Sequence, residues 1–188
     1  MDVQRDFCPG GALAVKCGNK VVPKLNKVIE AFSSASLPVY FTRDWHPPNH
    51  ISFKAQGGKW PPHCVMRTPG AEFHQKLIVP SEAIVINKGT RADVEAYSGF
   101  QGTDLAKRLN DAGVGEIFVG GLATDYCVKE SCLDALDAGF EVKVLKDCVM
   151  GVNLHESDSD LALREVADRG AELVTSSNAV KEVAVGVG

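Results

Sequence analysis

The sequence predicts an α/β fold of three layers, α/β/α, in which helices cover both faces of a mostly parallel, six-stranded sheet. Two observations support this prediction. From about Leu37 onward, short runs rich in β-branched and aromatic residues alternate with helical patterns. Strands that alternate with helices build parallel sheets, which helices cover on both faces. The 188 residues suit one domain, residues 1–188, with a substantial core.

The first part of the chain predicts a helix but no strand. A parallel sheet normally opens with an apolar strand, yet the chain passes from Met1 and Asp2 directly into the loop-like RDFCPGG. We expect Met1 to be an internal residue of a longer chain; the alternative is that the first strand was left out. The helix follows, with Pro23 in its first turn, where proline is tolerated. Its apolar positions at helical spacing are Val21, Leu25, Val28, Ile29 and Phe32.

Five further segments are predicted strands, namely LPVYFTRDW, AIVINKG, EIFVGGLA, EVKVLKDC and AELVTSS. Three predicted helices lie between them. GTDLAKRLNDAG has Thr103 as its N-cap and ends before Gly113. TDYCVKESCLDALDAG begins at its Thr-Asp pair and ends before Gly139. HESDSDLALREVADRG carries acidic residues early, where the helix dipole favours them, and stops at Gly170.

Composition and charge exclude several classes of partner. The formal net charge of −4 gives no reason to expect nucleic acid or an anionic membrane. No stretch approaches the roughly 20 apolar residues of a membrane span, and MDVQRDF is no signal peptide. The six cysteines show no CxxC pair and no zinc-finger spacing. Three disulfides would be possible in a secreted protein, but we expect six free thiols and a cytoplasmic protein.

Polar side chains follow the predicted strands at the edge where ligands bind in open parallel sheets. Asp2 would follow the absent first strand, Asp44 and His46 close the second, and Lys88 closes the third. Cys127 opens the helix after EIFVGGLA. An acid, two metal-binding residue types, a lysine and a thiol therefore meet at one edge of the sheet.

Cys127 is the candidate nucleophile. In the first turn of a helix its sulfur faces unpaired N–H groups and the positive end of the helix dipole, which predicts a lowered thiol pKa. Asp2 could take its proton, Lys88 could hold negative charge, and backbone N–H groups at Ala123 and Cys127 could form an oxyanion hole. The alternative is ordinary: a buried thiol that packs the helix, a solvated carboxylate and a surface lysine.

The segment of about residues 44–80 is rich in proline, histidine and glycine and long for a connector, which indicates a functional loop. Asp44 and His46 point to the same side of an extended strand. His63 follows two prolines, and His50 is a fourth candidate ligand. One carboxylate with two or three imidazoles suits one divalent Zn, Fe or Mn ion. The alternative is that D-x-H, a common pattern, binds nothing here.

Six motifs together resemble the nicotinamidases, or pyrazinamidases, of the isochorismatase-like cysteine hydrolases. They are DVQRDFCPGGALAV, RDWHPPNHISF, WPPHCVMRTPGAEFH, INKGT, AYSGF and GLATDYCV. The resemblance runs from Asp2 to about Ser176, in the order and spacing of the family. GxATDYCV marks the wider superfamily, whereas the DWH and WPPHC elements are specific to nicotinamidases.

This resemblance implies hydrolysis of nicotinamide to nicotinate and ammonia through a thioester, with zinc as the first expectation for the metal. It implies a triad of Asp2, Lys88 and Cys127, although sequence alone leaves Asp6 as an alternative acid. It also implies a cis peptide between Leu122 and Ala123. The metal ligands would be Asp44, His46 and His63, with His50 or water. The residues around the substrate ring would be Phe7, Trp60, Tyr97, Leu122, Ala123 and Tyr126.

Two rival functions stay open. One is a related cysteine amidase that acts on another small amide or carbamoyl compound, and the other is a catalytically silent binding protein. The metal motifs favour nicotinamidase over the first rival, and the complete triad argues against the second. The sequence leaves open a homo-oligomer, the identity of the metal and a role in cofactor salvage.

Overall fold

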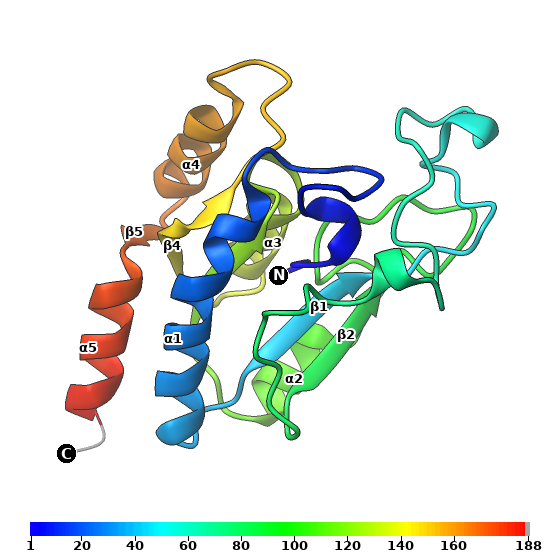
Figure 1. Cartoon of the computed structure of the whole chain (residues 1–188). Coiled ribbons are helices and arrows are strands. Elements are labelled where there is room, and N and C mark those ends of the chain that lie inside the picture. The colour runs from blue at the N-terminus through cyan, green and yellow to red at the C-terminus, as the bar shows by residue number, and fades with distance from the viewer. Residues whose placement is uncertain (187–188) are drawn as a thin grey trace.

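The computed structural model describes residues 1–186 and confirms the α/β class (Figure 1). All paired strands run parallel, in one pair, β1-β2, and one group of three, β3-β4-β5. The described residues hold five strands, one in each of the five segments predicted to form strands. The strands are β1 (Tyr40–Asp44), β2 (Ile84–Lys88), β3 (Glu116–Leu122), β4 (Glu141–Met150) and β5 (Glu172–Val174).

The first residues of the chain link the two groups of strands. The N–H of Asp2 donates to the carbonyl of Thr42 in β1 at 3.0 Å, and the N–H of Leu122 in β3 donates to the carbonyl of Met1 at 3.0 Å. The Met1 ammonium donates to the carbonyl of Gly120 at 2.6 Å. The N-terminus therefore lies in the middle of the molecule (Figure 1), and Asp2 sits between the carboxyl ends of β1 and β3.

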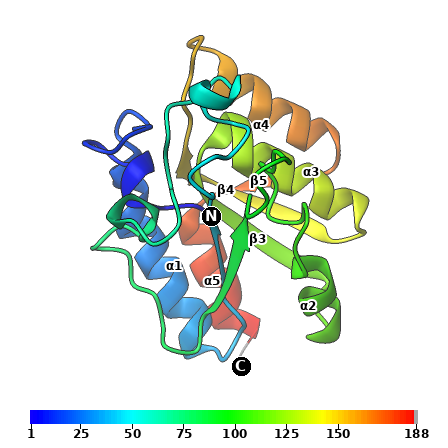
Figure 2. The same ribbon diagram turned by 90° about the vertical axis from the view of Figure 1, so that its right-hand side faces the viewer.

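Helices form one layer on each side of the strands, as predicted. One buried apolar cluster joins α1 and α5 to the strands, and a second joins α2, α3 and α4 to their other face (Figure 2). The helices are α1 (Val22–Ser34), α2 (Leu105–Asp111), α3 (Lys129–Asp137), α4 (Asp158–Asp168) and α5 (Ser176–Gly186).

Two details of the helices differ from the sequence patterns. The N-cap of α2 is Asp104 and not Thr103, whose hydroxyl donates to the carbonyl of Gly99 at 2.6 Å. No pattern predicts α5, because SSNAVKEVAVG is rich in residues of modest helix propensity. Packing stabilises this helix: Ala179 and Val183 are buried, and α5 lies against α1.

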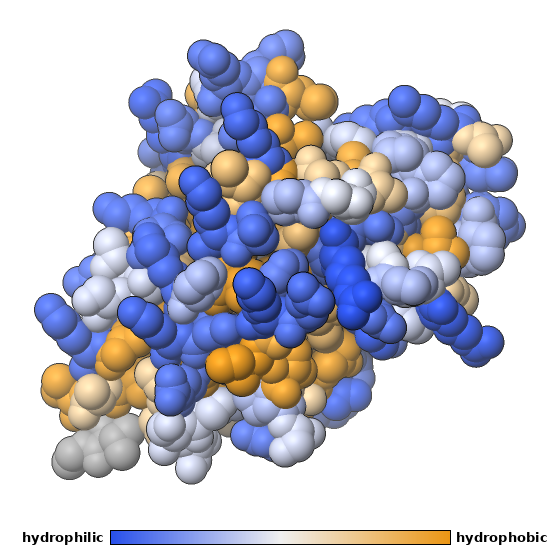
Figure 3. All heavy atoms as spheres, in the orientation of Figure 1, coloured by the Kyte–Doolittle hydropathy of each residue, from blue (hydrophilic) through white to orange (hydrophobic). Residues whose placement is uncertain are grey.

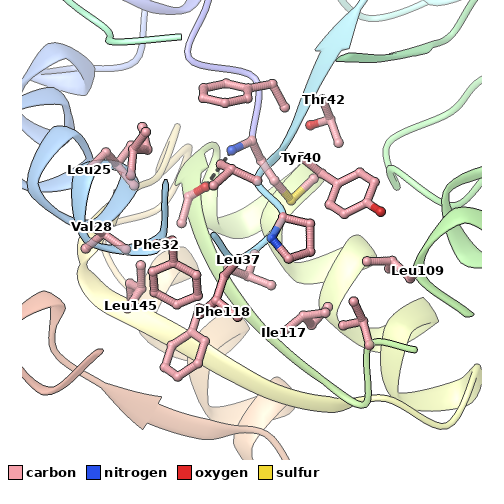
Figure 4. Close-up of a pocket in the computed structure, with 18 of the residues that line it drawn as sticks. Leu25, Val28, Phe32, Leu37, Tyr40, Thr42, Leu109, Ile117, Phe118 and Leu145 are labelled. Atoms are coloured by element: carbon pink, nitrogen blue, oxygen red, sulfur yellow. Dashed lines mark hydrogen bonds between the residues drawn. The ribbon is translucent and has the colours of Figure 1, made fainter. Parts of the chain in front are cut away.

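A groove runs between β1 and β3, beside the first residues of the chain. It encloses about 560 Å³, and apolar side chains make up most of its wall (Figure 4). On the surface, apolar residues gather between α1 and β1 (Figure 3). The side chains that project into the groove include Leu25, Val28, Phe32, Leu109, Ile117 and Phe118.

The segment between β1 and β2 is irregular, as predicted for residues 44–80. It contains two 3-10 turns, Lys54–Gln56 and Pro69–Ala71. All six cysteines are free thiols, which confirms that prediction. Among residues 1–186, no helix has both the length and the apolar character that a membrane crossing requires.

Candidate active site

The ends of three neighbouring chain segments bring the reacting groups together. β1 ends at Asp44 and β2 ends at Lys88, and these two residues pair in register. β3 ends at Leu122, and a single π-helical turn, Thr124–Val128, carries Cys127 back over the edge of the sheet. Such turns are frequent at functional sites. The carboxyl edge of the sheet thus assembles side chains that lie far apart in sequence.

Lys88 is the centre of the site. Its ammonium lies 3.0 Å from Oδ2 of Asp2 and 3.4 Å from Sγ of Cys127, and it donates a short hydrogen bond to Oδ1 of Asp44. The Lys88 side chain is 0% exposed. Thr42 donates to Oδ1 of Asp2 at 2.6 Å, which fixes the carboxylate that faces the lysine. A lysine so deeply buried is not the surface residue of the ordinary alternative.

Burial and charge set the protonation of this cluster. Burial alone would lower the pKa of Lys88, but the carboxylates of Asp2 and Asp44 raise it well above its ordinary value. Burial alone would raise the pKa of Asp44, but Lys88 and His46 hold it below its ordinary value. Lys88 is therefore an ammonium and Asp44 a carboxylate at neutral pH.

The predicted direction of the Cys127 pKa is wrong. Burial raises the pKa of this thiol well above its ordinary value, and the negative charges of Asp2 and Asp44 raise it further. Lys88 acts in the opposite direction without overcoming them. The resting group is consequently a thiol, and a nucleophilic role requires a base that removes its proton during the reaction.

The peptide bond between Leu122 and Ala123 is cis, as the resemblance implies. The carbonyl of Ala123 accepts the N–H groups of Tyr126 and Val128, both at 3.1 Å. These contacts place the backbone of Cys127 between two residues anchored to the turn. The oxyanion hole at Ala123 and Cys127 stays a prediction.

Asp44, His46 and His63 form a buried group whose ligand atoms all lie within 4.8 Å of one another. Nδ1 of His46 lies 2.9 Å from the carbonyl of Gly89, and Nδ1 of His63 lies 2.8 Å from that of Pro61. In a neutral ring that donates its Nδ1 proton to this carbonyl, Nε2 carries no proton and can bind a metal. Burial alone would lower the pKa of His46, but Asp44 raises it, so a cation would displace the proton from its Nε2. The residues therefore fit one divalent cation.

His50 lies outside this group of three. Its Nδ1 contacts the Ser52 hydroxyl at 2.7 Å, and its Nε2 contacts the carbonyl of Val94 at 3.0 Å. The ring stacks on His46 with 4.0 Å between centroids. Burial lowers the pKa of His50 to about 4, so the ring is neutral. In this arrangement His50 packs against His46. To bind the metal directly, His50 would have to give up its contact with either Ser52 or Val94.

Aromatic side chains gather beside the turn that carries Cys127. Trp60 Nε1 donates to the Tyr97 hydroxyl at 3.0 Å, and both rings pack against Tyr126, at 5.2 and 5.4 Å between centroids. Phe7 is buried and lies 5.6 Å from the His63 ring. The ammonium of Lys59 lies 5.0 Å from the ring centroids of Trp60 and Tyr126. Lys59 was not identified from the sequence as a residue of the site.

Two further residues escaped the sequence reasoning. Thr42 orients Asp2, and Gln4 binds the backbone of Asp44. Thr42 could have been found from periodicity, because Thr42 and Asp44 are two residues apart in β1 and share one face of the strand. No local pattern singles out Gln4. Asp6, the alternative acid, binds the backbone N–H of Cys64 and not the lysine, which leaves Asp2 as the acid at the site.

Comparisons with known proteins identify the family of this chain. Residues 1–178 match the model of the isochorismatase domain. The nicotinamidase of Escherichia coli is 40% identical over 93% of this chain and 92% of its own length. A pyrazinamidase of Pyrococcus horikoshii, solved in complex with zinc, is 50% identical, with a TM-score of 0.89 over 93% of this chain and 95% of that one. PnC1 from L. infantum, solved in complex with nicotinate, is 35% identical, with a TM-score of 0.83 over 94% of this chain and 90% of that one. The chain therefore belongs to the isochorismatase family, as its motifs predict.

Proposed function

We propose that this chain is a nicotinamidase, a metal-dependent cysteine amidohydrolase that converts nicotinamide to nicotinate and ammonia. The observation that carries this proposal is the buried ammonium of Lys88, which contacts Asp2, Asp44 and Cys127 at once. The E. coli nicotinamidase and the nicotinate complex of PnC1 support the choice of substrate. The P. horikoshii pyrazinamidase supports pyrazinamide as a second substrate.

The first half-reaction forms a thioester. Asp2 takes the proton of the Cys127 thiol while the Lys88 ammonium stabilises the negative charge on sulfur. The sulfur attacks the carboxamide carbon, so an S–C bond forms and the carbonyl electron pair moves to oxygen. Backbone N–H groups at Ala123 and Cys127 would hold this oxyanion. The pair then returns, the C–N bond breaks, and Asp2 gives its proton to the leaving nitrogen, which departs as ammonia.

The second half-reaction uses the same groups. A water molecule attacks the thioester carbonyl while Asp2 takes one of its protons. The C–S bond breaks, and the sulfur regains a proton from Asp2, which restores the thiol that burial favours at rest. The product is a pyridine carboxylic acid, which gives its remaining proton to water and leaves as the carboxylate. At rest Lys88 keeps its proton because, although burial alone would lower its pKa, the carboxylates of Asp2 and Asp44 raise it well above its ordinary value; Asp44 remains charged beside it while Asp2 carries the proton.

Asp44, His46 and His63 would hold the divalent cation, which we propose to be zinc, with iron or manganese as alternatives. When bound, the cation supplies a Lewis acid. The zinc complex of the P. horikoshii pyrazinamidase supports this choice. The rings of Trp60 and Tyr97 offer flat apolar surfaces that suit a pyridine ring.

The test is ammonia release from nicotinamide, pyrazinamide and ureido compounds, with and without a chelator, beside elemental analysis of the protein. We expect release from the first two compounds, loss with chelator, and one equivalent of metal. Release from ureido compounds alone would favour a related amidase, and no release from any compound would favour a silent binding protein. Full activity in metal-free protein would contradict the metal site. We propose a cytoplasmic location, which the six free thiols support.

A further inference from the structure

Alternate residues of the N-terminal segment carry polar side chains that hold the metal-binding loop. Asp2, Gln4 and Asp6 are alternate residues of this segment; Gln4 is extended, and Asp6 lies in the short 3-10 turn Arg5–Phe7. Asp2 faces Lys88, as described above. Gln4 is 0% exposed and Asp6 is half-buried. The contacts of Gln4 and Asp6 lead to two different ligands of the metal group.

The side-chain amide of Gln4 binds both backbone groups of Asp44, its N–H and its carbonyl. Its Oε1 accepts the N–H of Asp44 at 2.8 Å, and its Nε2 donates to the carbonyl of Asp44 at 2.8 Å. The second Nε2 proton goes to the carbonyl of Ala71 at 2.9 Å. The side-chain amide thus pairs with Asp44 as a neighbouring strand would, at the point where β1 ends. The backbone that carries the Asp44 carboxylate therefore cannot move without breaking buried hydrogen bonds.

Asp6 does the same for the segment that carries His63. Its Oδ2 accepts the N–H of Cys64 at 2.7 Å, and its Oδ1 accepts the N–H of Ala12 at 3.2 Å. Cys64 has a φ of +45°, a left-handed conformation that costs a residue with a side chain roughly 1 kcal/mol. The contact with Asp6 is charge-assisted and stabilises that backbone directly after His63.

We propose that Gln4 and Asp6 are positioning residues that set Asp44 and His63 at the separation one cation requires. This inference rests on the metal site of the proposed function and goes beyond it. Neither side chain is a ligand. Each fixes the backbone of a ligand, and together they tie the metal group to the segment that carries the base, Asp2.

The test measures metal binding and not only activity. Cobalt affinity, from competition with a coloured chelator, and the visible spectrum of the cobalt-loaded protein are compared for wild type, Gln4→Met, Asp6→Ala and Asp6→Asn. Loss of residues that orient metal ligands typically weakens binding 10- to 100-fold, and we expect about that loss for Gln4→Met and Asp6→Ala. Asp6→Asn keeps one oxygen for the Cys64 N–H and should recover part of it. Gln75→Met, at an exposed glutamine, is the matched control and should bind as wild type does.

Each variant is measured below the onset of its own thermal unfolding, so that a loss of stability alone leaves the affinity and the spectrum unchanged. If Gln4→Met does not fold, the comparison of Asp6→Ala with Asp6→Asn tests the inference. Wild-type affinity and an unaltered cobalt spectrum in Gln4→Met and Asp6→Ala would overturn the inference while the metal site stands. A wild-type protein that binds no metal would refute the metal site and this inference together.

Discussion

Replacing Lys88 with methionine removes the ammonium that Asp2 and Asp44 share and leaves most of the side-chain volume in place. Both carboxylates are buried, at 1% and 4% exposure, so neither can turn to water. One of them must then stay charged in the interior or take up a proton. Loss of one partner from a buried ion pair typically costs 3–5 kcal/mol.

The free energy of protonating one carboxylate gives a second estimate of the loss in stability. An aspartic acid in water has a pKa of about 3.9, and each pH unit above it costs about 1.4 kcal/mol, so protonation at pH 7 costs about 4 kcal/mol. At pH 5 the same step costs about 1.5 kcal/mol. The carboxyl that takes the proton has a raised pKa in the folded variant. Its penalty is therefore absent at low pH and appears as the pH rises. We expect Lys88→Met to lose about 4 kcal/mol of unfolding free energy at pH 7 and about 1.5 kcal/mol at pH 5.

Urea denaturation at both pH values measures this difference, and ammonia release measures the chemistry, which should fall by at least about 100-fold. The control is Lys107→Met, which breaks the exposed ion pair with Asp111 and should change stability by less than about 0.5 kcal/mol. An unfolding free energy for Lys88→Met equal to that of wild type, or a loss that does not depend on pH, would refute the reasoning about the shared ammonium.

Three further predictions concern the nucleophile, the metal group and a helix. Cys127→Ala should keep the urea midpoint within the range of ordinary core substitutions and release no ammonia; release at the wild-type rate would refute its role. In Gly89→Ala the new Cβ would lie 2.4 Å from Cε1 of His46, so elemental analysis should find less bound metal; unchanged metal content would contradict the site. Asp147 accepts two hydrogen bonds from Ser176 at the start of α5 and pairs with Lys24. Burial alone would raise the pKa of Asp147, but these contacts lower it. Asp147 therefore stabilises the fold above about pH 4, and this stabilisation is lost as the pH falls through the lowered pKa. Asp147→Asn should cost about 1 kcal/mol at pH 7 and little at pH 3 in urea titrations, and an equal cost at both values would contradict this.

The sequence predicts the parts of the site that depend on strand order. Asp44 and Lys88 end neighbouring parallel strands, and Cys127 follows a third, so the edge rule for open sheets brings them together. Strand ends can be read from apolar runs. The side-chain period of two predicts that Asp44 and His46 share one side, whereas His63 is a candidate only from its histidine-rich segment and the family resemblance.

Properties that depend on burial could not be predicted in this way. The position of Cys127 at a turn of helix predicts a lowered pKa, whereas complete enclosure raises it. Gln4 shows no chemistry by itself, and its role depends on the distant backbone of Asp44. For α5, packing against α1 overrides modest local propensity. In each case a contact distant in sequence decides the outcome.

The groove between β1 and β3 bears on how the protein should be handled. Met1 lies at its wall, beside the carbonyl of Gly120, in the interior of the molecule. Any residues joined to Met1 on its N-terminal side would pass along this groove, next to Asp2. α5 lies at the periphery (Figure 1), so a label on its exposed Lys181 leaves the interior undisturbed.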